Sequence, residues 1–390
     1  MPQSRPEHSY ITTTKALQEL CDALSLKSAI AIDTEFLRER TYRPQLCLVQ
    51  IKSDDILACI DAQAIDDLSP LLALLLNPNI TKVLHAASQD LEIFYLLSKG
   101  KVPAPIFDTQ LAAPLLGYNE QIGYGNLVKE MLGIELSKSQ TRADWTRRPL
   151  SDKQIDYALD DVIYLEQLYT KLHAELSALD RLDWLQPEFA QWENPAKYDQ
   201  PANQRWLKIR NVQRYKGPAL SCIQALAAWR EIKAREVNKP RNWLIKDDVL
   251  CALAQQQPDS LAELGHVRSL DKKTRDRYGS EIIDTINKAK TETPEPLPAF
   301  SKKKKLNAEN AAKLALLNAW GHQRAGELNI AATILTPPKL LERCVTDSIE
   351  EALQGWRAKL LQDDFARIMA GTHAVMVGTQ GLALNPVLVE

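Results

Sequence analysis

The stretch AIAIDTEF, residues 29–36, begins as an apolar strand and ends with two carboxylates, Asp33 and Glu35. Successive side chains of a strand point to opposite faces, so Asp33 and Glu35 share one face and Thr34 lies on the other. Two like charges at this spacing are unfavourable unless a cation lies between them. The stretch therefore predicts either a metal site on a strand or an exposed strand end with a basic partner. Further carboxylates near this strand would favour the metal site.

The segments after this stretch predict an α/β domain with a mixed sheet. The strand patterns QLCLVQIKS (residues 45–53) and ILACIDA (residues 56–62) are separated only by Asp54 and Asp55. So short a connection predicts an antiparallel hairpin, and with residues 29–36 the strands form a meander. Strands that are followed by interleaved helices are typical of this class. The later patterns are a strand at residues 80–86 and helices at residues 68–79, 88–100, 108–133 and 151–178.

Strand patterns disappear beyond about residue 204, where two helical blocks resemble each other. AWREIKAREVNKPRNWLIKDDVL (residues 228–250) aligns without gaps with AWGHQRAGELNIAATILTPPKLL (residues 319–341), at a constant offset of 91 residues. The identical pairs include Trp229 with Trp320, Ala234 with Ala325, Glu236 with Glu327, Asn238 with Asn329, and Leu244 with Leu335. An ungapped repeat of this length indicates a duplicated helical module.

The prolines and the repeat together predict five segments. They are a domain at residues 1–190, a linker at 191–205, a first helical module at 206–290, a Pro- and Lys-rich linker at 291–305 and a second helical module at 306–390. Trp206, Trp229 and Trp243 of the first module are predicted to be core residues.

Charge is distributed unevenly along the chain. Residues 1–190 carry 18 Lys and Arg against 27 Asp and Glu, whereas residues 191–390 carry 30 against 23. An acidic half suits a cation-dependent site, and a basic half suits a polyanion. No run approaches the roughly 18 apolar residues of a membrane helix, so no membrane contact and a cytoplasmic location are expected. The six scattered cysteines offer no close pair for zinc.

Two further segments could bring carboxylates to Asp33. Asp90 lies at the start of a predicted helix, where it could simply cap backbone N–H groups. In QIDYALDDVIYLEQLY, residues 154–169, the apolar positions form one helical face, and Asp161 and Tyr157, one turn apart, lie beside it. The neighbouring Asp156 and Asp160 lie on the far side, where they are predicted to be solvated.

These motifs resemble the DEDD exonuclease superfamily in its tyrosine-bearing branch. Asp33-Thr34-Glu35, Asp90 after HAASQ and Tyr157-x-x-x-Asp161 are similar to its three motifs, and residues 28–175 resemble ribonuclease D. The duplicated module resembles the HRDC domain, an α-helical nucleic-acid-binding unit, with a more degenerate second copy. The resemblance implies a mixed-sheet, ribonuclease H-like α/β exonuclease domain followed by two all-α HRDC-like domains.

The resemblance also implies a metal-dependent site. Four carboxylates without a Cys or His cluster are hard oxygen ligands, which suit Mg²⁺ or Mn²⁺. Two ions per active site are implied, with Asp33, Glu35 and Asp161 at the ion that activates water. Asp33 would bridge to the second ion, Asp90 would support that ion, and Tyr157 would orient the water.

The implied activity is that of a monomeric 3′→5′ exoribonuclease that releases nucleoside 5′-monophosphates. Its implied partners are precursor tRNAs and other structured RNAs with 3′ extensions. A DNA exonuclease of the same superfamily and a catalytically inactive RNA-binding scaffold are the alternatives. The complete set of motif residues argues against the scaffold, and no G-x-x-x-x-G-K-[ST] motif indicates an attached helicase.

A basic segment between the second and third motifs is predicted to hold RNA. Its cations would contact phosphates and Trp145 would stack on a base, although a solvated loop with a packed Trp explains the same residues. The residues are Lys138, Gln140, Arg142, Trp145, Arg147 and Arg148. The choice between RNA contact and solvation also applies to three arginines after the first motif, Arg38, Arg40 and Arg43, and solvation is favoured for each. His85 is predicted to be a hydrogen-bonded core residue.

Overall fold

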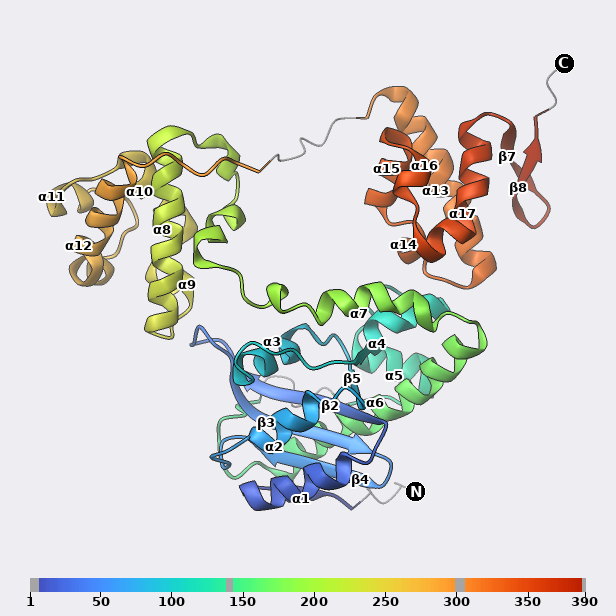
Figure 1. Ribbon diagram of the computed structural model, residues 1–390, viewed down its shortest axis with the longest axis horizontal. Helices are drawn as coiled ribbons and strands as arrows, with labels where there is room; N and C mark the ends of the chain where they lie inside the picture. The colour runs from blue at the N-terminus through green and yellow to red at the C-terminus, as the bar shows by residue number, and fades with distance from the viewer. Residues whose placement is uncertain (1–6, 138–142, 299–305, 388–390) are drawn as a thin grey trace.

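The computed structural model describes residues 7–137, 143–298 and 306–387, and begins with a six-stranded sheet (Figure 1). The order of the strands is β1-β4-β3-β2-β5-β6. Their bounds are Ser9–Ile11 (β1), Ala29–Leu37 (β2), Gln45–Ser53 (β3), Ile56–Asp61 (β4), Thr81–Leu84 (β5) and Ile106–Asp108 (β6). β2 pairs antiparallel with β3, and β3 pairs antiparallel with β4, which confirms the predicted meander. Because β1, β5 and β6 join in parallel, the sheet is mixed, as predicted.

Helices cover both faces of this sheet. They are Thr14–Leu24 (α1), Ser69–Leu75 (α2), Ser88–Leu97 (α3), Thr109–Ala112 (α4), Tyr124–Leu132 (α5), Asp152–Ala178 (α6) and Gln186–Trp192 (α7). Strand alternation divides the core: Ala31 and Leu48 face the cluster that contains α6, while Ile32 and Val49 face α1 and α2. Asp33 and Glu35 have the parity of Ala31, so their side chains leave β2 on the α6 face.

The first helical module has a core of its own. It contains Gly217–Glu236 (α8), Arg241–Leu244 (α9), Asp247–Gln256 (α10), Leu261–Leu264 (α11) and Lys272–Ala289 (α12). Trp206 is buried in that core and Trp229 packs against it, as predicted. The prediction for Trp243 is wrong, because its side chain is 58% exposed on the short helix α9, with the Lys239 ammonium 5.8 Å from its ring centre.

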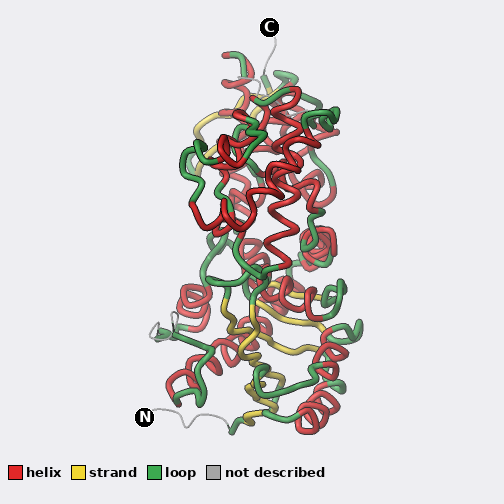
Figure 2. Tube along the Cα trace, turned by 90° about the vertical axis from the view of Figure 1, so that its left-hand side faces the viewer, coloured by secondary structure: helices red, strands yellow, loops and turns green. Residues whose placement is uncertain are grey.

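The second helical module contains five helices and a hairpin. The helices are Ala308–Leu328 (α13), Ala332–Leu335 (α14), Pro338–Thr346 (α15), Ile349–Ala352 (α16) and Gly355–Met369 (α17), and the strands are His373–Gly378 (β7) and Gly381–Pro386 (β8). Figure 2 shows strands both in the main sheet and in this hairpin near the C-terminus. The expectation that strands end before the helical modules is therefore wrong. Neither strand of the hairpin contains a fully buried residue, and Val375, Leu382 and Leu384 pack only partly against the core, so the apolar pattern in the sequence is weak.

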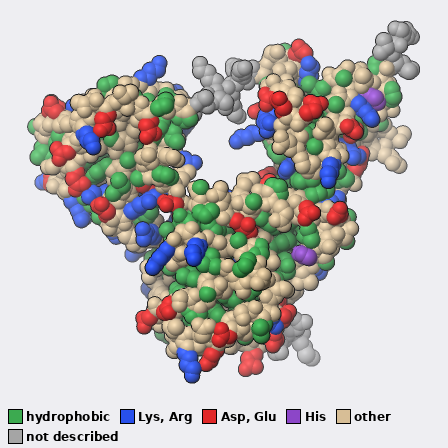
Figure 3. All heavy atoms as spheres, in the orientation of Figure 1, with side chains coloured by type: hydrophobic (Ala, Val, Ile, Leu, Met, Phe, Trp, Pro, Cys, Tyr) green, Lys and Arg blue, Asp and Glu red, His purple; other side chains and the backbone are tan. Residues whose placement is uncertain are grey.

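The second module shares a continuous apolar core with the sheet domain. Trp184 stacks on Trp356 at 4.5 Å between ring centres, with an angle of 2° between the rings. The buried Arg181 donates hydrogen bonds to the carbonyl oxygens of Leu115, at 2.6 Å, and Leu328, at 2.7 Å, and so joins both parts. In Figure 3 the two modules stand apart above the sheet domain with an open space between them.

Replacing Arg181 by Met should lower the thermal unfolding temperature. The change leaves one buried and one partly buried carbonyl group without their charged donor, at a cost of about 2–4 kcal/mol. Differential scanning calorimetry would measure the effect. Arg367→Met, at an exposed position on α17, is the matched control and should unfold at the wild-type temperature. Equal unfolding temperatures for both variants would contradict the bracing role of Arg181.

Candidate active site

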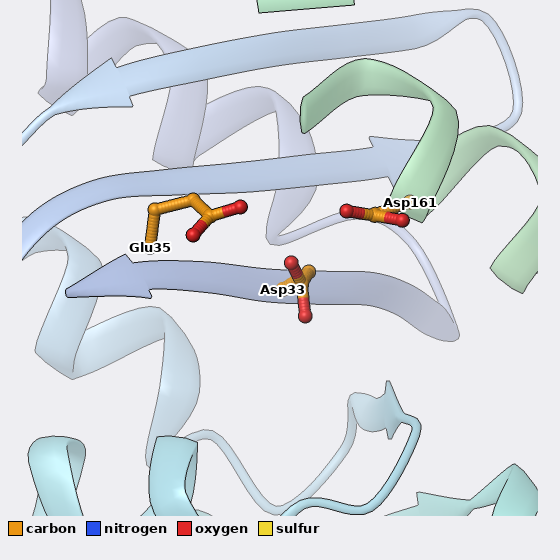
Figure 4. A group of neighbouring side chains, drawn as sticks. All are labelled: Asp33, Glu35 and Asp161. Atoms are coloured by element: carbon orange, nitrogen blue, oxygen red, sulfur yellow. The ribbon is translucent and has the colours of Figure 1, made fainter. Parts of the chain in front are cut away.

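Three carboxylates converge between β2 and α6. One oxygen of each of Asp33, Glu35 and Asp161 can be chosen such that all three lie within 4.8 Å of one another. Figure 4 shows Asp33 and Glu35 on the strand and Asp161 directed toward them from the helix. Such an arrangement of hard oxygen atoms can hold a divalent cation.

Helix α6 delivers the third carboxylate because of how it begins and packs. A capping box formed by Ser151 and Gln154 fixes its first turn. Its apolar face, which includes Ala158 and Val162, is fully buried over the sheet. This packing places Tyr157 and Asp161 in the wall of the cavity that Asp33 and Glu35 also line.

The cavity has a volume of about 410 Å³. Besides the four motif residues it is lined by His85, Gly123, Tyr124, Gly125, Asn126, Leu136, Ser137 and Leu165. A side chain at Gly123 or Gly125 would meet no atom within 4 Å, so the start of α5 leaves open space. The cavity can therefore receive a ligand of the size of a nucleotide beside the carboxylates.

Asp90 lies next to the three carboxylates but is held separately. Its side chain is 8% exposed and accepts a short hydrogen bond from the Thr34 hydroxyl, on the opposite face of β2 from Asp33. The negative charge of Asp90 contributes to the raised pKa values of both Asp33 and Glu35. The structure thus brings three of the predicted carboxylates within 4.8 Å of one another, with Asp90 near enough to act on two of them electrostatically, while their individual catalytic roles stay predictions.

Burial and mutual repulsion disfavour the charged forms of these groups. Burial, and then the charges of Asp161 and Asp90, raise the pKa of Glu35 to about 8. The same causes raise the pKa of Asp33 well above its usual range. Burial, followed by the charge of Asp160, raises the pKa of Asp161 to about 7. The cluster lacks a positive charge among the described residues, and a divalent cation would reverse this balance.

Two neighbours of the cluster were not found from the sequence. The Tyr124 hydroxyl donates to the carbonyl oxygens of Asp160, at 3.0 Å, and Asp161, at 2.6 Å, and so fixes the backbone that carries Asp161. Gln50 lies opposite Asp33 in the β2–β3 register, is fully buried, and has no hydrogen-bond partner for its amide among the described residues. An unpartnered buried amide beside Asp33 fits a site that binds a polar ligand or ion. The pattern Gly-Tyr-Gly at the start of α5 was the available signal for Tyr124; Gln50 had none, because it reads as an ordinary strand residue.

His85 is a hydrogen-bonded residue, as predicted. Its Nδ1 lies 2.9 Å from the Thr109 hydroxyl and its Nε2 lies 3.1 Å from the carbonyl oxygen of Ile122. Burial lowers the pKa of His85 to about 4, so the ring is neutral at pH 7. Protein groups already occupy both nitrogens, which leaves neither free for a metal.

The predicted RNA-binding segment is described only in part. Lys138, Gln140 and Arg142 lie outside the described residues. Trp145 is 5% exposed and packs against Tyr157, with 6.2 Å between ring centres, so its ring is covered in this conformation. Arg148 forms a two-pronged ion pair with the buried Asp61, at 2.5 and 2.7 Å. Contact of either residue with RNA stays a prediction.

The three arginines after β2 lie in different surroundings. Arg38 pairs with Glu92 through two hydrogen bonds, of 2.7 and 3.0 Å. Arg40 is exposed, and the backbone N–H of Arg43 donates to Asn238 in the first helical module, at 3.1 Å. This segment therefore contacts both α3 and the first module.

Comparison with known proteins places this geometry in context. The family described as 3′-5′ exonuclease matches residues 8–177, and the HRDC domain family matches residues 219–286. The proteins named Ribonuclease D from Sphingobium indicum and Acidiphilium cryptum are each 39% identical to the chain. The alignments cover 95% of this chain in both cases, and 96% and 95% of the respective relatives.

A solved structure extends the similarity to three dimensions. The crystal structure of Escherichia coli RNase D, described as an exoribonuclease involved in structured RNA processing, superimposes with a TM-score of 0.79 at 31% identity. The match covers 94% of this chain and 99% of that chain. Among the described residues of the present chain, no helix has the length and apolarity needed to cross a membrane.

The metal-free protein should lose stability as the pH rises from 5.5 to 8.0. Raised pKa values mean that the folded state binds protons that the unfolded state releases above about pH 4, so stability is present at low pH and is lost as pH rises. Mg²⁺ or Mn²⁺ should restore the unfolding temperature at pH 8.0. Thermal unfolding in EDTA and in excess metal ion measures both effects.

Glu35→Gln is the control for this experiment. Because it removes one of the repelling charges, the variant should show a smaller pH dependence than the wild type and a smaller gain from metal. An identical response of wild type and variant would contradict the assignment of the pH effect to this cluster.

Proposed function

The chain belongs to the ribonuclease D family, and on that premise we propose that it removes nucleotides from the 3′ ends of structured RNAs, such as precursor tRNAs. Each cycle hydrolyses the terminal phosphodiester bond and releases a nucleoside 5′-monophosphate. The observation that carries the proposal is the convergence of Asp33, Glu35 and Asp161 beside a cavity that a terminal nucleotide can enter. The Escherichia coli relative, named for structured RNA processing, supports the choice of substrate.

The donor set fits two divalent cations of the Mg²⁺ or Mn²⁺ type. Asp33, Glu35 and Asp161 would hold the first, and Asp33 and Asp90 would hold the second. Bound ions of this kind lower the pKa of water and stabilise negative charge that develops at a phosphoryl group. The four clustered carboxylates offer only oxygen atoms, which argues against zinc.

The protein's own residues keep this arrangement in place. Thr34 holds Asp90 by its hydroxyl group, and Tyr124 holds the backbone at Asp161. The Tyr157 ring packs against Trp145 at the cavity wall, where its phenol can donate to or accept from an attacking water. Tyr157 thus orients the water, while the carboxylates bind the cations.

We also propose that the chain is organised as a nuclease domain at residues 1–190 and two HRDC-like modules at residues 206–290 and 306–390. The HRDC match at residues 219–286 supports the first module. The constant offset of the duplicated sequence supports the second, whose helix α13 carries Trp320 at the position of Trp229.

Replacing Asp33 by Asn should reduce hydrolysis of a 3′-tailed RNA by about a thousandfold or more. The change removes the charge of the carboxylate that faces both proposed ions, while the side-chain volume is kept. Single-turnover kinetics measure the loss, and an unchanged circular dichroism spectrum confirms folding. Asp156→Asn, on the exposed side of α6, is the matched control and should keep full activity. Retention of more than a few percent of activity in Asp33→Asn would remove Asp33 from the site.

Tyr157→Phe should slow the reaction by about ten- to a hundredfold without weakening metal binding. Only the hydroxyl is lost, so the carboxylates keep their positions. Kinetics at saturating Mn²⁺, together with a calorimetric Mn²⁺ titration, separate the two effects. A weaker affinity for Mn²⁺ would show that Tyr157 acts on the metal site instead of on water.

Matched RNA and DNA oligonucleotides with the same 3′ tail would test the substrate. We expect trimming of the RNA to shorter products with release of 5′-monophosphates, and loss of this activity in excess EDTA. Faster trimming of the DNA would favour a DNA exonuclease, and binding without trimming of either strand would favour an inactive scaffold.

A further inference from the structure

A buried carboxylate of the first helical module binds a residue of the nuclease domain. Glu231 on α8 is fully buried. Its oxygens pair with Arg205 at 2.9 Å, with Arg235 at 3.2 Å and with Arg241 at 3.2 Å. They also accept a short hydrogen bond from the hydroxyl of Tyr42, 189 residues earlier in the chain. Three of these partners belong to the module or its linker, and Tyr42 is the partner from the nuclease domain.

The surroundings of Glu231 favour its ionised form. Burial alone would raise its pKa, but the hydrogen bond from Tyr42 and the charges of Arg205, Arg241 and Arg235 together lower it below the usual value. An ionised carboxylate in a buried position is costly unless its oxygens are fully paired. A hydrogen bond to such a charge is stronger than one between neutral groups. Tyr42 therefore completes a set of donors that the carboxylate needs.

The segment that carries Tyr42 leads directly to the catalytic carboxylates. It follows β2, whose Glu35 is seven residues before Tyr42. Arg38 of the same segment pairs with Glu92 on α3, the helix that carries Asp90. The Arg235 guanidinium lies 5.8 Å from the centre of the Tyr42 ring. One short segment thus contacts the first module on one side. On the other side it is continuous with the first catalytic motif and pairs with the helix that carries the second.

The duplicated second module shows what is special to the first. At the constant offset of 91 residues, Glu231, Arg235 and Arg241 correspond to His322, Gly326 and Ala332, so the second module has no counterpart of the ionic cluster. Each module nevertheless makes one equivalent contact with the nuclease domain. Asn238 accepts from the backbone N–H of Arg43, and its counterpart Asn329 donates to the carbonyl oxygen of Leu116.

Both asparagines have the same backbone geometry. Their φ angles are 46° and 48°, at the C-terminal ends of the matching helices α8 and α13. Both modules therefore contact the nuclease domain with the same helix end. The first adds charged groups to that contact, whereas the second adds a shared apolar core.

A polar groove of about 640 Å³ runs along the charged contact. One side is formed by the nuclease segment with Arg38, and the other by Lys208 and Arg241 of the first module and the segment before it. The groove exists only while the two sides are held together. The groove is also lined by three carboxylates, Glu39, Glu92 and Asp247. Cations still outnumber them, with Arg38, Arg205, Lys208, Arg230 and Arg241 on the walls, and this excess suits the phosphates of a polynucleotide.

We propose that Glu231 is a positioning residue that, through Tyr42, locks the first helical module beside the metal site and so aligns the groove for RNA upstream of the 3′-terminal nucleotides. This inference rests on the proposed function, because it assigns the path of the same RNA substrate. RNA that extends beyond the active-site cavity depends on the lock. A substrate of two to four nucleotides, whose 3′-terminal nucleotide enters the cavity and which extends little beyond it, should depend on the lock much less.

Tyr42→Phe and Glu231→Gln test the lock by steady-state kinetics on two substrates, a hairpin RNA with a single-stranded 3′ tail and a tetranucleotide. In both variants the KM for the tailed hairpin should rise about tenfold with little change in kcat. For the tetranucleotide, kcat/KM should stay within about twofold of the wild type. Small-angle X-ray scattering should show a larger radius of gyration for the variants. Glu309→Gln removes an exposed carboxylate that pairs with Lys313 in the second module, and it should match the wild type in every measurement.

The outcomes separate this inference from the proposed function. An unchanged KM for the tailed hairpin in Tyr42→Phe, or an equal loss on both substrates, would overturn the lock while hydrolysis by the wild type still upheld the nuclease. Absence of hydrolysis by the wild type with Mg²⁺ would instead overturn the proposed function, and the inference with it. Tyr42→Phe removes one hydroxyl only, so it decides the question even where Glu231→Gln fails to fold.

Discussion

Electrostatic repulsion between buried carboxylates is the constraint on which the site depends. Asp33, Glu35 and Asp161 lie close together with their charged forms disfavoured by burial and by one another. Other interactions must offset this repulsion for the domain to fold. Burial of the apolar face of α6 against the meander contributes the stabilising free energy. The rigid parts of the domain, a central strand and a 27-residue helix, carry the groups that repel most strongly. Loops would let such groups move apart.

The sequence predicts well those parts of the fold in which apolar residues repeat with the period of one strand or one helix. Alternation along β2 placed Asp33 and Glu35 on one face, and the helical period of residues 154–169 selected Asp161 with Tyr157. Both results follow from backbone geometry and the position of apolar neighbours, and neither requires knowledge of distant contacts. The two-residue connection at Asp54 and Asp55 fixed the antiparallel meander for the same reason.

What could not be predicted depends on residues far apart in the chain. Nothing in the sequence indicates that Thr34 holds Asp90 or that Arg148 pairs with Asp61. The Gly-Tyr-Gly pattern marks Tyr124 but does not show that its hydroxyl reaches the backbone of Asp161. The sequence left the role of Trp145 undecided, because an aromatic residue among cations is typical both of a surface on which bases stack and of a packed core. The hairpin β7–β8 was not predicted because its strands contain no fully buried residue, so their apolar pattern is weak.

The duplicated modules show how one structural unit can be attached by two different forces. The second module merges with the nuclease core mainly through apolar packing, which includes the stack of Trp184 on Trp356, and the hydrogen bonds of Arg181 and Asn329 supplement this contact. The first is held through Glu231 and Tyr42, a contact that depends on hydrogen-bond geometry and loses its strength when one donor is withdrawn. An apolar attachment suits a permanent brace. An attachment through a paired buried charge sets one specific orientation, because partial displacement leaves the charge unpaired, and orientation is what a surface that guides a polynucleotide toward a fixed metal site requires.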